Sequence, residues 1–214
     1  MSETEIAIVG CGPKGLYALD SLFEAARRSP RCRFTVHIFE PSAHPGAGPN
    51  YDPRQPEVLL MNFPAGLINA WTDGRGPSFL EWAAKSPKPV DAGDYVPRAH
   101  VGRYLFWSFE RVVAQSPSNV RLIRHKTRVD AVNRNGDQWH ISPQNITVDH
   151  VLITTGHQDG FRHSATETHD HIPSPFPIDQ RLTQTAVPPN STVRCKGFAL
   201  TFIDTMLALT EGRG

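Results

Sequence analysis

A glycine-rich turn between a buried strand and a helix constrains this chain more than any other feature of its sequence. The turn is Gly10-Cys11-Gly12-Pro13-Lys14-Gly15. The apolar run 5–9 before it predicts a buried parallel strand, and leucines at helical spacing after it predict a helix up to about Arg28. The run 34–39, which ends at Glu40, predicts a second strand. This succession of strand, turn, helix and strand predicts a βαβ unit in an α/β fold.

The spacing of the three glycines matches that of a dinucleotide-binding turn. Gly10 would make the tight turn, Gly12 would let the backbone approach a pyrophosphate, and Gly15 would let the helix pack closely on the strand. The helix N-terminus would offer N–H groups to the phosphates. Pro13 fits the first helical turn, where its missing N–H costs no hydrogen bond. With Lys14, these residues form the expected pyrophosphate site, and a plain strand-to-helix turn is the alternative.

Glu40 stands where this fold recognises a ribose. A carboxylate at the end of the second strand can accept hydrogen bonds from both ribose hydroxyls, and it would repel a 2′-phosphate. The site therefore favours FAD or NAD over NADP.

The remaining sequence predicts a Rossmann-like domain with an antiparallel β-meander, followed by the start of a second dinucleotide-binding domain. We expect a first dinucleotide-binding domain over residues 1–160, a linker over 161–191 and a shortened second unit over 192–214; the family resemblance described below implies that the first binds FAD and the second NAD(P). Alternating apolar and polar residues around Asn135-Gly136 predict the meander. The other predicted elements are helices at 78–84, 98–114 and 200–209, and strands at 119–124, 150–155 and 192–196.

Charge and cysteine content exclude several classes of partner. The 22 basic residues nearly balance the 21 acidic ones, so no net field draws the chain to nucleic acid or to an anionic membrane. Cys11, Cys32 and Cys195 form no C-x-x-C pair, which argues against a disulfide framework or a zinc site. The apolar runs are too short to span a bilayer, and the N-terminus does not read as a signal peptide. We expect a cytoplasmic protein.

Four histidines lie in the predicted linker or just before it. They are His157, His163, His169 and His171. The His169-x-His171 pair could hold a metal ion, but no cysteine or second regular pair accompanies it. We therefore expect a solvated loop and no metal.

Several longer segments resemble a known family. Together with the glycine turn, the meander and the strand that ends at Thr155-Gly156, the sequence resembles the two-dinucleotide-binding-domain flavoproteins. The resemblance is closest to the bacterial FAD-NAD(P)-binding proteins, whose relatives are the flavin-containing monooxygenases and the lysine and ornithine N-hydroxylases. It implies FAD as cofactor, NAD(P)H as a reductant and an oxidoreductase of monooxygenase type. The matching segments are His44–Pro53, Leu60–Ala65, Val96–Leu105 and Gly197–Asp204.

The resemblance also implies residues near the flavin. Asn62 lies in an Asn-x-Pro segment that approaches the isoalloxazine ring in flavin-containing monooxygenases, where an amide can hydrogen-bond ring heteroatoms and act in catalysis. The alternative is a loop asparagine in an Asx turn before Pro64. Gly46 and Gly48 fall in a loop that the resemblance sets beside the cofactor, and a mobile surface loop is the alternative there.

Three further residues are expected to contact the cofactor. Arg98 could bind a pyrophosphate or carboxylate through two parallel hydrogen bonds. Because Arg98 and Arg103 do not share a helix face well, we expect a surface salt bridge for at least one of them. Thr155 and Gly156 end a strand that would pass close to the nucleotide, although an ordinary strand end is the simpler interpretation.

The resemblance sets a second, NAD(P)H-binding turn at Gly197, Ala199 and Thr201. Ala199 replaces the glycine expected in the middle of that turn, which puts reduction by NAD(P)H in doubt for this chain alone. The rival hypothesis is therefore a non-catalytic module that binds a dinucleotide without turnover. We expect a small-molecule substrate of unknown identity, and a homo-oligomer or a partner chain could complete the second domain.

Overall fold

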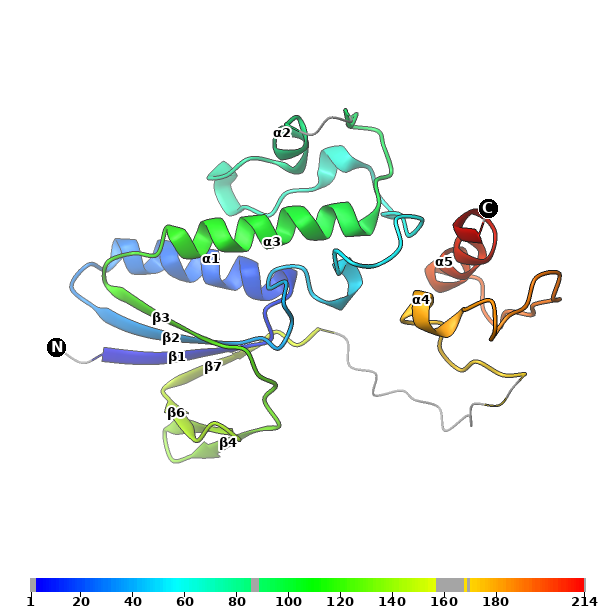
Figure 1. The fold of residues 1–214 in the computed structure, drawn as a ribbon. Helices are drawn as coiled ribbons and strands as arrows, with labels where there is room; N and C mark the ends of the chain where they lie inside the picture. Colours follow the sequence, from blue (N-terminus) through cyan, green and yellow to red (C-terminus); the bar gives the residue numbers. More distant parts are fainter. Residues whose placement is uncertain (1–2, 86–88, 157–167, 169, 214) are drawn as a thin grey trace.

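The fold is built around a four-stranded parallel sheet, seen in a computed structural model of the 214-residue chain (Figure 1). The structure describes residues 3–85, 89–156, 168 and 170–213. The sheet order is β3-β2-β1-β7, with all neighbouring pairs parallel. The strands are β1 (Glu3–Val9), β2 (Arg33–Phe39), β3 (Val120–His125) and β7 (His150–Ile153).

The register of the sheet aligns the carboxyl ends of its strands. Val9 of β1 pairs with Phe39 of β2 on one side and with Ile153 of β7 on the other. The Gly10 turn, Glu40 and the residues after β7 therefore meet at one edge. This edge is where ligands bind in open α/β sheets, and the predicted Rossmann-like fold is confirmed.

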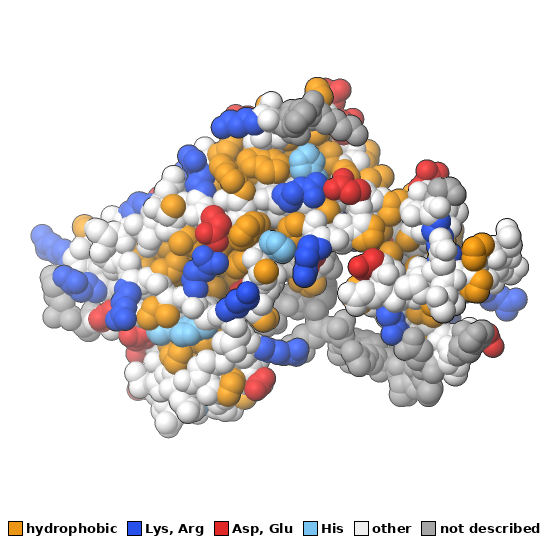
Figure 2. All heavy atoms as spheres, in the orientation of Figure 1, with side chains coloured by type: hydrophobic (Ala, Val, Ile, Leu, Met, Phe, Trp, Pro, Cys, Tyr) orange, Lys and Arg blue, Asp and Glu red, His pale blue; other side chains and the backbone are white. Residues whose placement is uncertain are grey.

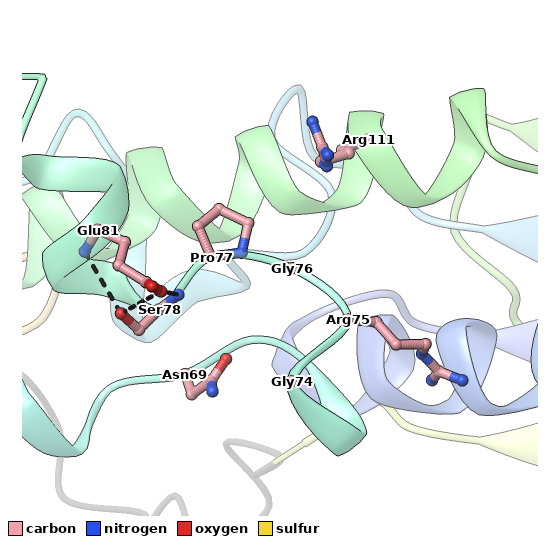
Figure 3. Close-up of a pocket in the computed structure, with 8 residues that line it drawn as sticks. All are labelled: Asn69, Gly74, Arg75, Gly76, Pro77, Ser78, Glu81 and Arg111. Carbon is pink, nitrogen blue, oxygen red and sulfur yellow. Dashed lines mark hydrogen bonds between the residues drawn. The ribbon is translucent and has the colours of Figure 1, made fainter.

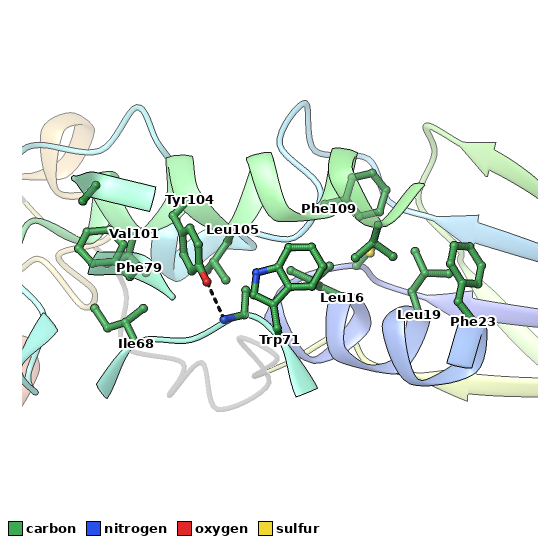
Figure 4. Close-up of a cluster of buried hydrophobic side chains, with 14 of the residues drawn as sticks. Leu16, Leu19, Phe23, Ile68, Trp71, Phe79, Val101, Tyr104, Leu105 and Phe109 are labelled. Atoms are coloured by element: carbon green, nitrogen blue, oxygen red, sulfur yellow. Dashed lines mark hydrogen bonds between the residues drawn. The ribbon is translucent and has the colours of Figure 1, made fainter. Parts of the chain in front are cut away.

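Two long helices cover one face of the sheet. They are α1 (Pro13–Arg28) and α3 (Arg98–Ala114), and their apolar side chains meet in the main core (Figure 4). The short helix α2 (Phe79–Ala83) is capped by Ser78, because the Ser78 side chain accepts from Glu81 N–H and the Glu81 side chain accepts from Ser78 N–H. Tyr104 of α3 fixes the loop beneath, because its hydroxyl accepts from Ala70 N–H at 3.0 Å and donates to the Pro77 carbonyl at 2.7 Å.

A three-stranded antiparallel sheet packs on the opposite face. It comprises β4 (Ala131–Asn135), β5 (Gln138–Ser142) and β6 (Ile146–Val148). Ile141 and Val148 are fully buried against Ala7, Val9 and Phe39 of the parallel sheet. The predicted meander is thus confirmed.

The C-terminal part of the chain has two helices, α4 (Ile178–Arg181) and α5 (Leu200–Leu209). The predicted strand at 192–196 is wrong, because these residues are exposed and irregular. A strand needs a neighbour to take its hydrogen bonds, and no described segment pairs with this one. Single 3₁₀ turns complete the described structure at Pro49–Tyr51, Ala65–Leu67, Thr72–Gly74 and Glu211–Arg213.

The surface carries both signs of charge. Figure 2 shows basic and acidic side chains over the same face of the molecule. Within the described part of the chain, every helix is too short or too polar to cross a membrane.

Candidate cofactor site

The turn after β1 requires glycine at its first position. Gly10 has a φ of +84°, and a Cβ there would lie 2.9 Å from the Cα of Thr155. Its N–H donates to the Phe39 carbonyl at 2.9 Å, which ties the turn to the end of β2. Only a residue without a side chain fits between these two strand ends.

Helix α1 sits directly on this turn. A Cβ at Gly15 would lie 2.6 Å from the Gly10 carbonyl oxygen and 3.1 Å from Thr154 Oγ1. The Thr154 hydroxyl itself donates to that carbonyl at 2.5 Å. Thr154 therefore also holds the turn in place. The sequence analysis selected its neighbour Thr155 and missed this residue. The alternation of side chains along β7 was the available signal.

The N-terminus of α1 is open to an anion. Gly12 is the N-cap, and no side chain caps the helix there. Pro13 occupies the first turn, as expected, and Lys14 is exposed. A Cβ at Gly12 would meet only Gly48, whose Cα lies 3.5 Å away. The free backbone N–H groups of this turn and the helix dipole suit a phosphate group.

The loop after Glu40 packs on the glycine turn and is not a loose surface loop. The Gly46 N–H donates to the Cys11 carbonyl at 2.6 Å, and Gly46 and Ala47 are buried. A Cβ at Gly46, which has a φ of +90°, would lie 2.6 Å from the Leu105 carbonyl oxygen of α3. Gly48 has a φ of +66° and lies against Gly12. Both glycines thus have a packing role that is independent of any ligand.

The Glu40 carboxylate holds the turn and the following loop together. Its Oε2 accepts from Cys11 N–H at 2.7 Å, and its Oε1 accepts from Ser42 N–H at 2.9 Å. Each oxygen of a carboxylate has two lone pairs, so each keeps one for a ligand hydroxyl.

A cavity of about 170 Å³ lies beside Glu40 at the carboxyl ends of β2 and β3. Lys126 and Arg124 bring positive charge to it, although Arg124 also pairs with Glu110 at 3.1 Å. A negatively charged nucleotide fits this charge. The cavity is lined by Ile38, Glu40, Ser42, Ala43, Pro45, Phe109, Arg124, His125 and Lys126.

The thiol inside the glycine turn carries no charge at neutral pH. Cys11 is fully buried, and burial together with the nearby Glu40 carboxylate raises its pKa to about 12. A thiolate at this position would repel a phosphate, so the neutral thiol fits the binding of an anion. The bare glycines, the uncapped helix and the neutral thiol together fit the pyrophosphate of FAD.

Asn62 is exposed, and the extended segment beside it is anchored to the residues that lead into α3. Met61 N–H donates to the Val96 carbonyl at 2.9 Å, and Leu60 pairs with Pro97. The Asn62 side chain makes no hydrogen bond to another described residue, so the Asx turn is not formed. Its proposed place near the flavin stays a prediction.

Arg98 contacts a carboxylate rather than the glycine turn. Its Nη2 lies 2.6 Å from Asp204 Oδ2 of α5, and only 18% of the Arg98 side chain and 9% of the Asp204 side chain are exposed. The two groups form an ion pair, but their geometry is not that of a hydrogen bond. Among the described residues, Nε and Nη2 of Arg98 have no hydrogen-bond acceptor. Arg103 forms an exposed pair with Glu57 at 2.9 Å, which confirms the expected surface salt bridge.

The end of β7 lies beside the glycine turn, as its order in the sheet requires. The Thr155 Cα packs behind Gly10, and Thr155 itself is exposed. Gly156 is also exposed, with a φ of +73°. The structure thus brings Thr155 and Gly156 to the edge where Glu40 and the N-terminus of α1 lie.

The second predicted turn has none of these supports. Gly197 has a φ of +108°, but a Cβ there would meet nothing within 4 Å. Ala199 is the N-cap of α5, and Thr201 lies in its first turn, where its carbonyl accepts from Thr205 Oγ1 at 2.8 Å. The described residues directly before this helix, 192–199, form no strand, so these residues do not form a dinucleotide turn by themselves.

A second hollow is wide, open and polar. Its volume is about 500 Å³, and it lies between the loop after Asn69 and the side of α3 (Figure 3). Arg75 on its rim is already paired with Asp20 at 2.8 Å and with Glu24 at 2.9 Å. Its lining includes neither the glycine turn nor Glu40. The lining residues are Asn69, Gly74, Arg75, Gly76, Pro77, Ser78, Glu81 and Arg111.

Among the described residues, no cluster of histidine, cysteine and carboxylate side chains could hold a metal ion. Three of the four linker histidines, His157, His163 and His169, lie outside the described residues.

Comparison with known proteins assigns the family. The L-aspartate N-monooxygenase (nitrosuccinate-forming) of Streptomyces davaonensis is 30% identical over 98% of this chain and 39% of its own length. Nitrosuccinic acid synthase npaA of Aspergillus oryzae is 31% identical over the whole chain and 36% of its own length. The chain therefore spans less than two fifths of either relative.

A solved structure, Tmm from Pelagibacter sp. strain HTCC7211, aligns with 72% of the chain and 36% of its own, at 19% identity and a TM-score of 0.45. A sequence model of the FAD-NAD(P)-binding family matches residues 7–158, which include the glycine turn, Glu40 and the end of β7. The chain belongs to the FAD-NAD(P)-binding family.

Proposed function

We propose that this chain is the FAD-binding part of a flavin-dependent N-monooxygenase. The observation that carries the proposal is the glycine turn, which is closed from both sides by Glu40 and by the end of β7. The two relatives described above are named for N-oxidation of L-aspartate or formation of nitrosuccinate, which supports an amino acid as the substrate class.

The residues present would hold FAD from its adenosine end. The pyrophosphate would lie at the N-terminus of α1, where Gly12 leaves room and Lys14 adds a charge. The ribose hydroxyls would donate to the free lone pairs of Glu40, and the adenine would enter the cavity beside Lys126. When bound, FAD supplies the redox chemistry, for which protein side chains have no equivalent.

The flavin end is proposed from position alone. Thr155 and Gly156 leave the sheet at its ligand-binding edge, and their exposure makes them available to a ligand. Asn62 is proposed as the amide that contacts the flavin ring, since its side chain is exposed and forms no hydrogen bond within the described chain. Arg98 would contact the cofactor only after a ligand displaces Asp204 from its guanidinium group.

Reduction by NAD(P)H needs a second site, which the unit at 192–214 would begin. We propose that further polypeptide, from a longer chain or a second copy, completes it. We also propose the domain limits of 1–160, 161–191 and 192–214, and a cytoplasmic location.

The non-catalytic module stays as the second candidate. Two observations favour it: a Cβ at Gly197 would meet nothing within 4 Å, and no strand of the described chain leads directly into α5. This candidate binds FAD but does not oxidise NAD(P)H.

A visible absorbance spectrum tests both candidates. The purified protein is recorded before and after addition of FAD, then NADPH, then L-aspartate. Flavin bands that bleach with NADPH support the monooxygenase and exclude the module. Bands that persist in this chain alone fit both candidates, and they support the module only if they also persist when the further polypeptide that completes the second site is present. Failure to bind FAD contradicts both.

A matched pair of variants ties binding to the turn. Gly12→Ala adds a methyl group that the fold accepts, because its nearest neighbour is at 3.5 Å, but that group projects into the pyrophosphate position. Gly93→Ala adds the same group where nothing lies within 4 Å. Only Gly12→Ala should weaken FAD binding.

A further inference from the structure

One arginine enters the cavity beside Glu40 from the helix-covered face of the parallel sheet. In the register of the sheet, Arg124 of β3 is the partner of Ile38 of β2, so the two side chains project from the same face. Ile38 belongs to the main core, to which α1 and α3 also contribute. Both residues line the cavity, so the Arg124 side chain lies between the core and the space that a ligand would fill.

The guanidinium group of Arg124 lies over an aromatic ring. Its central carbon, Cζ, is 4.9 Å from the centroid of the Phe109 ring, within the range of a cation–π contact. Phe109 is fully buried in the main core (Figure 4). A Cβ at Gly46 would lie 3.0 Å from the Phe109 Cβ, so the loop after β2 packs tightly against this residue. The ring is therefore a fixed support for the guanidinium.

A carboxylate holds one edge of the same guanidinium. Arg124 Nη1 lies 3.1 Å from Oε1 of Glu110, the residue that follows Phe109 on α3. A guanidinium is planar, so it has two faces, and one of them lies on the Phe109 ring. The opposite face is the one that a ligand can reach, since 44% of the Arg124 side chain is exposed.

The cavity has the size and the lining of a site for one flat ring system. Its volume of about 170 Å³ is below the roughly 300–1,000 Å³ of a pocket that encloses a whole ligand, so it would take only one end of a dinucleotide. Ile38 and Phe109 line it from the core, and Ala43 and Pro45 line it from the loop after Glu40. These apolar side chains suit a flat, uncharged base.

We propose that Arg124 is the platform on which the adenine of FAD stacks, with the Phe109 ring beneath the guanidinium. The inference rests on the proposed FAD site and adds to it a residue that selects for a purine. Because Glu40 lines the same cavity, a ribose held by its carboxylate would bring the attached base to the guanidinium. Guanidinium planes stack on bases as aromatic rings do. A purine offers two fused rings to this platform, whereas a pyrimidine offers one.

Lys126 also lines the cavity, but it cannot act in the same way. An ammonium group is a compact point charge and has no flat surface for a base. The competing interpretation is that Arg124 binds a phosphate through its charge, which a lysine can also do. The two roles predict opposite results when Arg124 is replaced by lysine, because that change keeps the charge and removes the plane.

The test compares ADP with UDP as competitors of FAD, because the two nucleotides share the ribose and the pyrophosphate and differ in the base. Flavin fluorescence follows the displacement of FAD from the full chain. We expect ADP to bind about 3- to 10-fold more tightly than UDP. If FAD binds but the two nucleotides compete equally, or neither competes, this inference is overturned alone. If FAD does not bind, the proposed function fails with it.

A matched pair of variants assigns the preference to the plane of the guanidinium. Arg124→Lys should bring the affinities for ADP and UDP close together, mainly by weakening ADP. Arg121→Lys makes the same change on the same strand, but Arg121 is the partner of Thr35 and projects from the opposite face of the sheet. It should keep the wild-type preference. A preference that survives in Arg124→Lys, or is lost in both variants, overturns the proposal.

A measurement without mutation covers the case in which a variant fails to fold. In the complex of the full chain with ADP, the H2 and H8 protons of adenine should give nuclear Overhauser effects to the side-chain methylene protons of Arg124. Such effects to other side chains but none to Arg124 overturn the proposal.

Discussion

The hydroxyl of Thr154 donates a 2.5 Å hydrogen bond to the carbonyl oxygen of Gly10. This bond joins the end of β7 to the first residue of the glycine turn, and it is made by a side chain that the motif itself does not contain. The Thr154 N–H also donates to the Val9 carbonyl at 2.8 Å. The shape of the turn therefore depends on a strand from the far end of the domain.

Replacement of Thr154 by valine keeps the volume and removes the hydroxyl. We expect the free energy of unfolding to fall by about 1 kcal/mol and FAD binding to weaken, because the Gly10 carbonyl loses its partner. Urea denaturation and flavin titration measure the two effects. Thr154→Ser keeps the hydroxyl and should retain most of the binding, whereas equal losses in both variants would show that the methyl group contributes as much as the hydroxyl.

Replacement of Gly10 by alanine combines two penalties. The residue has a positive φ, and the added Cβ would lie 2.9 Å from the Thr155 Cα. We expect a loss of about 3 kcal/mol or more in the free energy of unfolding. Gly136→Ala is the matched control, since Gly136 also has a positive φ of 62° but nothing within 4 Å, and it should cost about 1 kcal/mol. Similar costs at both sites would contradict the close packing of β7 on the turn.

The three cysteines should differ sharply in reactivity. Cys11 is buried and its pKa is raised to about 12, whereas Cys32 and Cys195 are exposed. At pH 8 only about one Cys11 thiol in 10⁴ is ionised, so a thiol reagent should modify two cysteines quickly and the third only on unfolding. Mass spectrometry after timed alkylation identifies them. Rapid labelling of Cys11 would show that the turn opens in solution.

Loss of the Arg98–Asp204 pair should detach α5 from the N-terminus of α3. Asp204→Asn leaves the shielded guanidinium without a counter-charge, and we expect a loss of about 2 kcal/mol in the free energy of unfolding. Glu57→Gln breaks the exposed Arg103 pair instead, and it should cost less than about 1 kcal/mol. Urea denaturation of the two variants gives the comparison, and equal effects would mean that Asp204 is as well solvated as Glu57.

Local chemistry explains which features the sequence could predict. The glycine turn, Glu40 and α1 are neighbours in the chain, and the constraint on each glycine is set by nearby backbone. α3 likewise begins and ends where its apolar periodicity predicts. Both features depend on residues that are close together along the chain, and a sequence pattern can predict such features.

Features that need a distant partner were harder to predict. The acidic partner of Arg98 comes from a helix more than a hundred residues away, and no pattern around Arg98 specifies it. The segment 192–196 has the composition of a strand, but composition provides no neighbour to pair with. The contacts of His37 with Glu5 and His125 could not be predicted, because the three residues lie on three different strands and only the sheet order brings them together.

The distance along the chain between Gly10 and Thr154 also determines the order of events during synthesis. The two partners are 144 residues apart, and closing so long a loop carries a large entropic cost before any contact offsets it. During synthesis on a ribosome, β1, β2 and β3 emerge before β7 and can pair. The Gly10 carbonyl has no hydrogen bond from Thr154 until the end of β7 has also emerged. A nascent chain shorter than about 155 residues should therefore not retain the cofactor, and FAD capture becomes a late step that reports completion of the sheet.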